Sequence, residues 1–164
     1  MDRTLRLVAR TLHPPRGTAW HGGPTPAGTL RGVSARDAAR RPLRGRHTIW
    51  ELALHLAYWN YAVHRRLLLA MGHERIARFP RSPANWPAMP KWATETAWAA
   101  DRALLAEVHR RLREVINRFP AALLDRKAAG RRRWTCGDLI LGITVHDAYH
   151  AGQIQLLKRH RQAR

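Results

Sequence analysis

Apolar residues recur at intervals of three and four along most of this chain, the spacing that places them on one face of an α-helix. Leu5, Val8 and Leu12 form the first such series, which stops before Pro14 and Pro15. A short helix is expected to end there, because proline cannot continue a helix. No stretch alternates β-branched and polar residues in the way of a half-buried strand. The pattern therefore predicts an all-α fold.

The second long helix has a well-marked start. Thr48 and Glu51 have the spacing of a capping box, in which the side chain of each residue accepts a hydrogen bond from the backbone N–H of the other. Apolar residues then follow at three and four from Ile49 to Leu67. We expect this helix to end near Gly72, since glycine is common just past a helix end.

Two more long helices are expected in the second half of the chain. Four prolines predict a loop over residues 77–91, and a helix follows over about 93–118. A second capping box, Thr135 with Asp138, opens a last helix that runs to about His160.

Short elements are expected between the first and second long helices. Thr25 before Pro26 can start a brief turn of helix, and Ser34 can cap another short helix with Asp37 three residues on. The most direct architecture is a four-helix bundle with short extra helices at this point. A chain of this length makes about one domain, so we expect residues 1–164 to form a single domain.

The chain is strongly basic, with 30 basic and 11 acidic residues and a net charge of +19. Such a charge permits binding to nucleic acid, because phosphate neutralisation dominates those affinities. However, 27 of the basic residues are arginine and they are spread along the whole chain, which favours a solvated basic surface. Clusters at residues 40–46 and 131–133 keep the nucleic-acid alternative open.

Other composition features limit the location and the kind of metal site. The single cysteine, Cys136, excludes an internal disulfide and a cysteine-rich metal site. The chain has no apolar run of membrane-spanning length and no signal-peptide pattern at its start, so we expect a soluble cytoplasmic protein that meets no membrane. Any metal must rely on histidine and carboxylate ligands.

Two histidines stand four apart in the apolar run GITVHDAYHAGQI, residues 142–154. On a helix, His146 and His150 project from one face on successive turns, a spacing that one metal ion accepts. Gly142 and Gly152 each cost about 1 kcal/mol against alanine inside a helix, which predicts close packing against a neighbouring helix.

Helix geometry selects a third histidine. His55 lies on the apolar side of the second long helix and can face the pair across the bundle. His64 points about 180° away from it, and His47 and His160 are too distant along their helices. The alternative is that His55, His146 and His150 are core histidines satisfied by hydrogen bonds, with Tyr58, Tyr149 and Gln153 nearby. Burying three imidazoles in a small core costs free energy unless each ring has a partner, and this favours a metal ion that all three share.

Three stretches resemble the DinB-like proteins, the DinB/YfiT superfamily. Residues 142–154 are similar to its G-I-x-x-H-D-x-Y-H-x-G-Q-I signature. HTIWELALHLAYW, residues 47–59, looks like its helix-two motif that contains a metal histidine, here His55. AWHGGP, residues 19–24, resembles its W-H-G-P turn with one extra glycine.

The resemblance implies an up-down-down-up four-helix bundle that binds a divalent ion, commonly nickel or zinc, through three histidines. Relatives often form homodimers. Members with known activity include S-transferases and isomerases that use bacillithiol, mycothiol or similar low-molecular-weight thiols, and metal-dependent hydrolases. The family name records induction by DNA damage and is no evidence for DNA binding.

Two classes of function stay open. The first is a metal-dependent enzyme in which His55, His146 and His150 hold a divalent ion with an open position for substrate, more in the manner of a thiol-dependent S-transferase than of a hydrolase. The second is a basic protein without catalysis, in which the metal is structural and the surface binds nucleic acid. No catalytic residue is assigned at this stage.

Further residues are expected to line the pocket of such an enzyme. Gln153 lies about one turn beyond His150, Trp59 lies one turn beyond His55, and His21 sits in a glycine-rich turn that could fold over the site. Glu51 is better explained as a capping residue than as a general base.

Asp147 follows a predicted ligand but is turned about 100° from it, toward a neighbouring helix or the solvent. Cys136 is expected to be a buried structural residue.

Overall fold

A computed structural model of the chain describes residues 3–12, 25–41, 45–130 and 133–162. The elements are α1 (Arg3–Leu12), α2 (Pro26–Thr29), α3 (Ala35–Ala39), α4 (Ile49–Ala70), α5 (Glu95–Arg118), the 3-10 helix η1 (Ala121–Leu123) and α6 (Cys136–Gln162). Extended pairing in these ranges is confined to one isolated bridge between Lys127 and Thr135. The all-α expectation is confirmed, with α2 and α3 between the first and second long helices.

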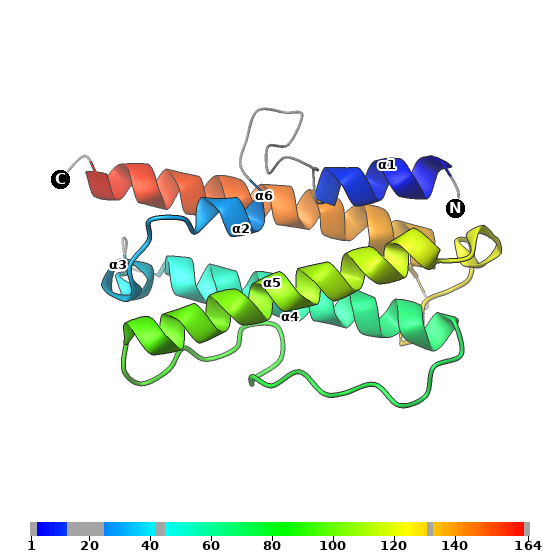
Figure 1. Cartoon of the computed structure of the whole chain (residues 1–164), viewed down its shortest axis with the longest axis horizontal. Coiled ribbons are helices and arrows are strands. Elements are labelled where there is room, and N and C mark those ends of the chain that lie inside the picture. The colour runs from blue at the N-terminus through cyan, green and yellow to red at the C-terminus, as the bar shows by residue number, and fades with distance from the viewer. Residues whose placement is uncertain (1–2, 13–24, 42–44, 131–132, 163–164) are drawn as a thin grey trace.

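The long helices form an up-down-down-up bundle. α1 and α6 run in one direction along the molecule, and α4 and α5 run in the other (Figure 1). α4 packs against both α5 and α6, and α1 packs against α5 and α6. Because α4 and α5 are parallel, residues 71–94 return along the length of the bundle as an irregular loop (Figure 1).

The helix starts agree with the capping pattern. The Thr48 hydroxyl accepts a hydrogen bond from the Glu51 amide at 3.1 Å, and the Glu51 carboxylate accepts one from the Thr48 amide at 2.7 Å. α4 ends at Ala70, and Gly72 adopts a φ of 88°, a left-handed conformation that glycine reaches without strain. These contacts fix the position of α4, which carries His55.

A layer of polar side chains divides the hydrophobic core into two clusters. One cluster combines the beginning of α4, the first half of α5 and the end of α6, and the other combines the end of α4, the second half of α5 and the beginning of α6. Buried Asn60 of α4, His109 of α5 and Asp147 of α6 lie between the two sets of apolar residues along their helices. Burying polar groups costs free energy unless they are paired, so this layer needs an explanation of its own.

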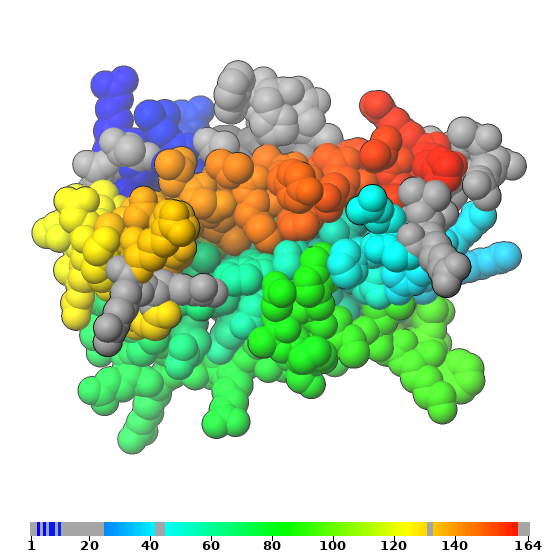
Figure 2. Space-filling model, turned by 180° about the vertical axis from the view of Figure 1, so that it is seen from behind, coloured from blue at the N-terminus to red at the C-terminus, as the bar shows by residue number. Residues whose placement is uncertain are grey.

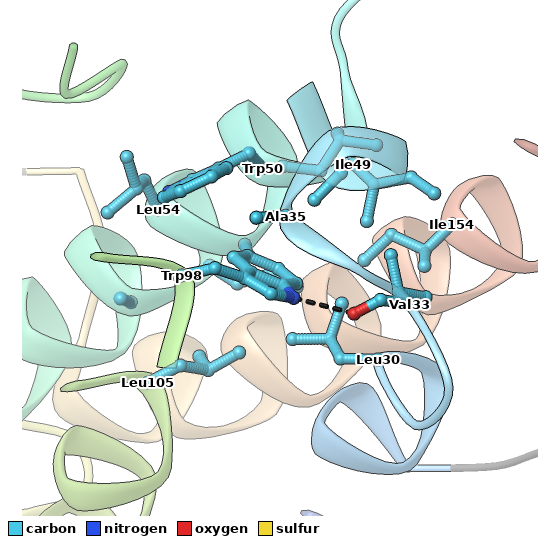
Figure 3. Packing of buried hydrophobic residues seen from close by; sticks show 14 of the residues in the cluster. Leu30, Val33, Ala35, Ile49, Trp50, Leu54, Trp98, Leu105 and Ile154 are labelled. Atoms are coloured by element: carbon cyan, nitrogen blue, oxygen red, sulfur yellow. Dashed lines mark hydrogen bonds between the residues drawn. The ribbon is translucent and has the colours of Figure 1, made fainter. Parts of the chain in front are cut away.

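Two buried tryptophans tie the loop regions to the first cluster. The Trp98 indole donates to the Val33 carbonyl at 2.7 Å, as the dashed line in Figure 3 marks. The Trp50 indole donates to the buried Asp101 carboxylate at 2.9 Å, and Arg81 of the long loop donates to the same carboxylate at 2.6 Å. Arg81 thereby fastens the loop of residues 71–94 to α5, four residues before the part of the loop that reaches the site.

None of the described helices combines the length and the apolar content that crossing a membrane requires.

Candidate metal centre

His55 of α4 and His146 and His150 of α6 converge between the two helices. One ring nitrogen from each residue lies within 4.8 Å of the others. The Nε2 atoms of His55 and His146 are 3.1 Å apart. In the described part of the chain, no other group of three histidine, cysteine or acidic side chains is arranged to hold an ion. We call this group the three-histidine centre.

The spacing of the nitrogens fits a shared ion. Metal–nitrogen bonds of about 2.0 to 2.1 Å, at angles from square to tetrahedral, place two ligand nitrogens about 2.8 to 3.4 Å apart. The observed 3.1 Å between His55 Nε2 and His146 Nε2 lies inside that range. The donor set, imidazole nitrogens alone, suits zinc, nickel and other first-row divalent ions.

Hydrogen bonds orient two of the three rings. The His55 Nδ1–H donates to the Asn85 carbonyl at 2.6 Å, and the His150 Nδ1–H donates to the Gln153 side-chain oxygen at 2.8 Å. A neutral imidazole that carries its proton on Nδ1 has its lone pair on Nε2. Both rings therefore present Nε2 as the metal-binding atom, in the arrangement by which outer partners fix metal-ligating histidines.

The environment also keeps these rings neutral. Burial lowers the pKa of His55 to about 4, against the opposing effect of the hydrogen bond to the Asn85 carbonyl. Burial likewise lowers the pKa of His150, against the opposing effect of the hydrogen bond that His150 donates to Gln153. Metal binding requires the neutral imidazole, so both rings are in the binding form at neutral pH.

The loop between α4 and α5 covers one side of the three-histidine centre. The Trp86 indole stacks on the His55 ring, with centroids 3.8 Å apart and planes 14° apart, and on the His47 ring, at 3.6 Å and 8°. Two parallel rings so close to one indole must lie on its opposite faces. The Asn85 side-chain oxygen also accepts from the Trp59 indole at 2.8 Å. The loop thus fixes both His55 and Trp59.

Neither Asn85 nor Trp86 was identified from the sequence, which predicted only a loop over residues 77–91. The sequence places this asparagine and this tryptophan inside a proline-rich segment. Proline restricts the backbone and helps a loop to hold one conformation, and this was the available sign of an ordered loop. Helical periodicity carries no information about where such a loop lies.

The polar layer of the core adjoins the centre at Asp147. Its buried carboxylate accepts two hydrogen bonds from the Asn60 amide at 2.9 and 3.1 Å, and lies 3.1 Å from His109 Nε2. Burial raises the pKa of Asp147, but His109 and the hydrogen bonds outweigh it and hold the pKa below its usual value. Asp147 turns toward α4 and α5, which is the first of the two outcomes, a neighbouring helix or the solvent, that helix geometry predicted.

Sequence analysis missed Asn60 and His109, the partners of Asp147. His109 lies three residues before Leu112, near the apolar face of α5, and that position was its only signal. The three side chains join α4, α5 and α6 at one level of the bundle.

His47, His64 and His160 stay outside the centre, as expected from the direction of His64 and from the distances of His47 and His160. His64 is half-buried near α5, where burial and then Arg111 and Arg118 lower its pKa. His160 is exposed near the end of α6. His47 does not belong to the cluster, yet it contacts the centre indirectly through Trp86.

Glu51 and Cys136 have structural surroundings. Glu51 caps α4 and receives a hydrogen bond from Arg41 at 2.6 Å, which helps to lower its pKa although burial raises it. Cys136 is fully buried, and burial raises its pKa. Neither residue is poised for proton transfer or nucleophilic attack.

Two cavities are associated with the three-histidine centre: one includes His146 in its lining, and the other includes Gln153, the hydrogen-bond partner of His150. The first, here the apolar cavity, has a volume of about 280 Å³ and is lined by Trp59, Val63, Trp134, Leu139, Ile143 and His146, among others. The second, here the basic cavity, has a volume of about 380 Å³ and is lined by Arg46, His47, Leu52, Gln153, Leu156 and Leu157, among others. Trp59 and Gln153 therefore each line a cavity beside the centre. His21 lies outside the described residues.

The described residues contradict the packing explanation for the two glycines of α6. A Cβ atom added at Gly142 or Gly152 would meet no atom of these residues within 4 Å, so neither glycine permits a close approach of another described segment. Gly142 instead lines the apolar cavity, where a side chain would occupy space. Nothing in the described structure explains Gly152.

Fold and site together define a helical bundle with a three-histidine centre between its second and last long helices. A family model described as the DinB superfamily matches residues 25–154. This range covers most of the chain and includes all three histidines, so the chain belongs to the DinB superfamily. No curated protein and no solved structure matches the chain.

Proposed function

We propose that the protein binds a divalent metal ion, nickel or zinc, through His55, His146 and His150, and acts as a thiol-dependent S-transferase. The observation that carries the proposal is the convergence of three imidazole nitrogens within 4.8 Å, with two of the rings already held in the metal-binding tautomer. A divalent ion held by three histidines keeps a position for an outside ligand and lowers the pKa of a thiol or water bound there.

The two cavities favour a transferase over a hydrolase. A transferase needs space for two organic molecules. The apolar cavity includes His146 in its lining, and the basic cavity includes Gln153, the hydrogen-bond partner of His150. The basic cavity carries Arg46 and His47, which suit the carboxylate groups of a low-molecular-weight thiol.

The carboxylates nearest in sequence to the ligands are already engaged. Glu51 caps α4 and pairs with Arg41, and Asp147 is buried with Asn60 and His109. A hydrolase would gain from a carboxylate free to take a proton from water, so their engagement counts against hydrolysis. Hydrolysis stays the alternative reaction.

Metal binding is tested first. The purified protein, stripped with a chelator and reloaded, should take up one nickel or zinc ion per chain by elemental analysis and calorimetry. His55→Ala, His146→Ala and His150→Ala should each remove most of the affinity. His160→Ala, an exposed histidine on the same helix as two of the proposed ligands, is the matched control and should bind like the original protein. Equal uptake by all variants would exclude this centre.

The reaction is tested with the loaded protein. Bacillithiol or mycothiol is supplied with an aryl halide, and loss of free thiol is followed with and without the metal. Thiol consumption that requires the metal and His146 supports the transferase. Hydrolysis of an ester or amide without any dependence on thiol would instead favour the alternative.

The protein is also proposed to form a homodimer. Light scattering should then give twice the mass of one chain.

The alternative is a non-catalytic protein that binds nucleic acid. It predicts retention on DNA or RNA that falls steeply with salt, and absence of retention at low salt would exclude it.

A further inference from the structure

The apolar cavity lies between α4 and the beginning of α6, at the His146 side of the three-histidine centre. Figure 2 shows the side of the molecule on which α6 (orange to red) lies alongside α4 (cyan to green). Trp59 and Val63 come from α4, Leu139 and Ile143 from α6, and Trp134 from the turn that precedes α6. The cavity is thus a space between helices that opens beside one of the proposed metal ligands.

The described residues that line the cavity offer almost no partner for a charge. Asp138 is the one acidic residue of the lining, and its carboxylate accepts hydrogen bonds from the Thr135 amide and hydroxyl, both at 2.8 Å. Its capping role therefore accounts for its presence. A charged ligand group would lose its hydration here without compensation, whereas an apolar group would gain from leaving water.

Two indoles form aromatic walls of the cavity. The Trp59 indole N–H is bonded to Asn85, and the Trp59 ring lies 6.1 Å from the His146 ring. The Arg133 guanidinium lies 4.8 Å from the Trp134 ring centroid, within the range of a cation–π contact. Aromatic walls favour a flat or branched apolar guest over a long flexible one, because a rigid guest loses less conformational freedom on binding.

Gly142 adds an independent observation. It stands inside α6, where glycine costs about 1 kcal/mol against alanine, and packing does not explain it. It lines the apolar cavity. The missing side chain leaves room in the cavity at the turn of α6 that precedes His146.

We infer that the apolar cavity binds a neutral apolar group, an aryl ring or a branched alkyl group, of the molecule that reacts at the three-histidine centre. The volume of about 280 Å³ is close to the lower limit of about 300 Å³ for small-molecule sites, which suits one substituted ring. The inference rests on the proposed function, because it takes the centre as the reaction site.

The test uses 4-fluorotoluene as the probe and its fluorine NMR signal as the readout. Binding is measured on the full chain, first free of metal and then loaded with nickel. Gly142→Leu places a side chain in the cavity and should weaken binding at least tenfold. Gly152→Leu makes the same change on the same helix outside the cavity lining and should leave binding unchanged. Trp134→Ala, at a residue 43% exposed, removes one wall with little risk to the fold and should also weaken binding.

The two parts of the experiment separate the inference from the proposed function. Nickel in the centre should broaden the fluorine signal of bound probe strongly, because the cavity includes His146. Absence of binding, equal binding to the Gly142→Leu and Gly152→Leu variants, or a bound signal that nickel does not broaden would each overturn the inference. If nickel is not taken up at all, the proposed function fails, while binding to the metal-free protein still decides whether the cavity takes an apolar group.

Discussion

The His55 ring lies flat against the Trp86 indole, with centroids 3.8 Å apart and planes 14° apart. On its edge, the same imidazole donates from Nδ1 to the carbonyl of Asn85, the residue before Trp86. One short piece of loop therefore fixes both the tilt and the rotation of the ring. A metal ligand held in this way loses little freedom when an ion binds, so the loop contributes to affinity without touching the ion.

Trp86→Ala should lower nickel affinity by about tenfold, because the His55 ring gains rotational freedom once the stacked indole is removed. Trp92→Ala is the control, since Trp92 belongs to the same loop but is 71% exposed. Calorimetry on both variants measures the difference. Equal affinities for the two variants would contradict an orienting role for Trp86.

Gln153→Leu should weaken metal binding by about 10- to 100-fold, the usual effect of losing the outer partner of a ligating histidine. The leucine cannot accept the hydrogen bond that His150 Nδ1 now donates at 2.8 Å. Gln155→Leu removes a side-chain amide from the same turn of α6 and should bind metal normally. A Gln153→Glu variant should retain the affinity, since a carboxylate also accepts this hydrogen bond, and its failure to do so would argue against the orienting role.

The buried pair of Asp147 and His109 should stabilise the bundle when both members are present. Asp147→Leu or His109→Leu alone should lower the free energy of unfolding by about 3 to 5 kcal/mol, because each change takes away the oppositely charged neighbour of a buried side chain. The double variant should lose much less than the sum, since coupled neighbours are not additive. Urea unfolding with a chelator present measures this cycle, and additive losses would mean that the two residues do not act as a pair.

The fold was predictable because its signals are local. Spacing of apolar residues and the Thr48–Glu51 capping box located α4, and the starts of the other long helices agreed within about two residues. The pairing of His146 and His150 followed from their separation along one helix. His55 followed from the apolar face of another, since inward faces of packed helices meet.

The rest of the centre was not predictable because it depends on contacts between distant segments. Asn85 reaches His55 only because the loop after α4 runs back along a bundle with two parallel helices. The bond between Asp147 and Asn60 joins residues 87 positions apart. No repeating pattern in the sequence indicates either contact, and none indicates the cavity beside Gly142.

The stability of the metal-free protein should fall as the solution is acidified below the ordinary histidine pKa, and His64 should account for part of the fall. Burial, with Arg111 and Arg118 nearby, lowers the pKa of His64 below the ordinary histidine value of 6.5. The unfolded chain therefore binds a proton at a higher pH than the folded chain does. The stabilising contribution is complete above about pH 6.5 and is lost as the pH falls through the lowered value.

The His64→Gln variant lacks the side chain that takes up this proton on unfolding. The free energy of unfolding of the variant should therefore decrease less than that of the original protein between pH 7 and pH 5. Urea unfolding at several pH values, with a chelator present, gives the two slopes. His160→Gln, at an exposed histidine near the end of α6, is the control and should keep the original slope. If His64→Gln and the original protein lose stability in parallel, the cost of charging a histidine between α4 and α5 is too small to matter. The acid sensitivity would then belong to other groups of the bundle.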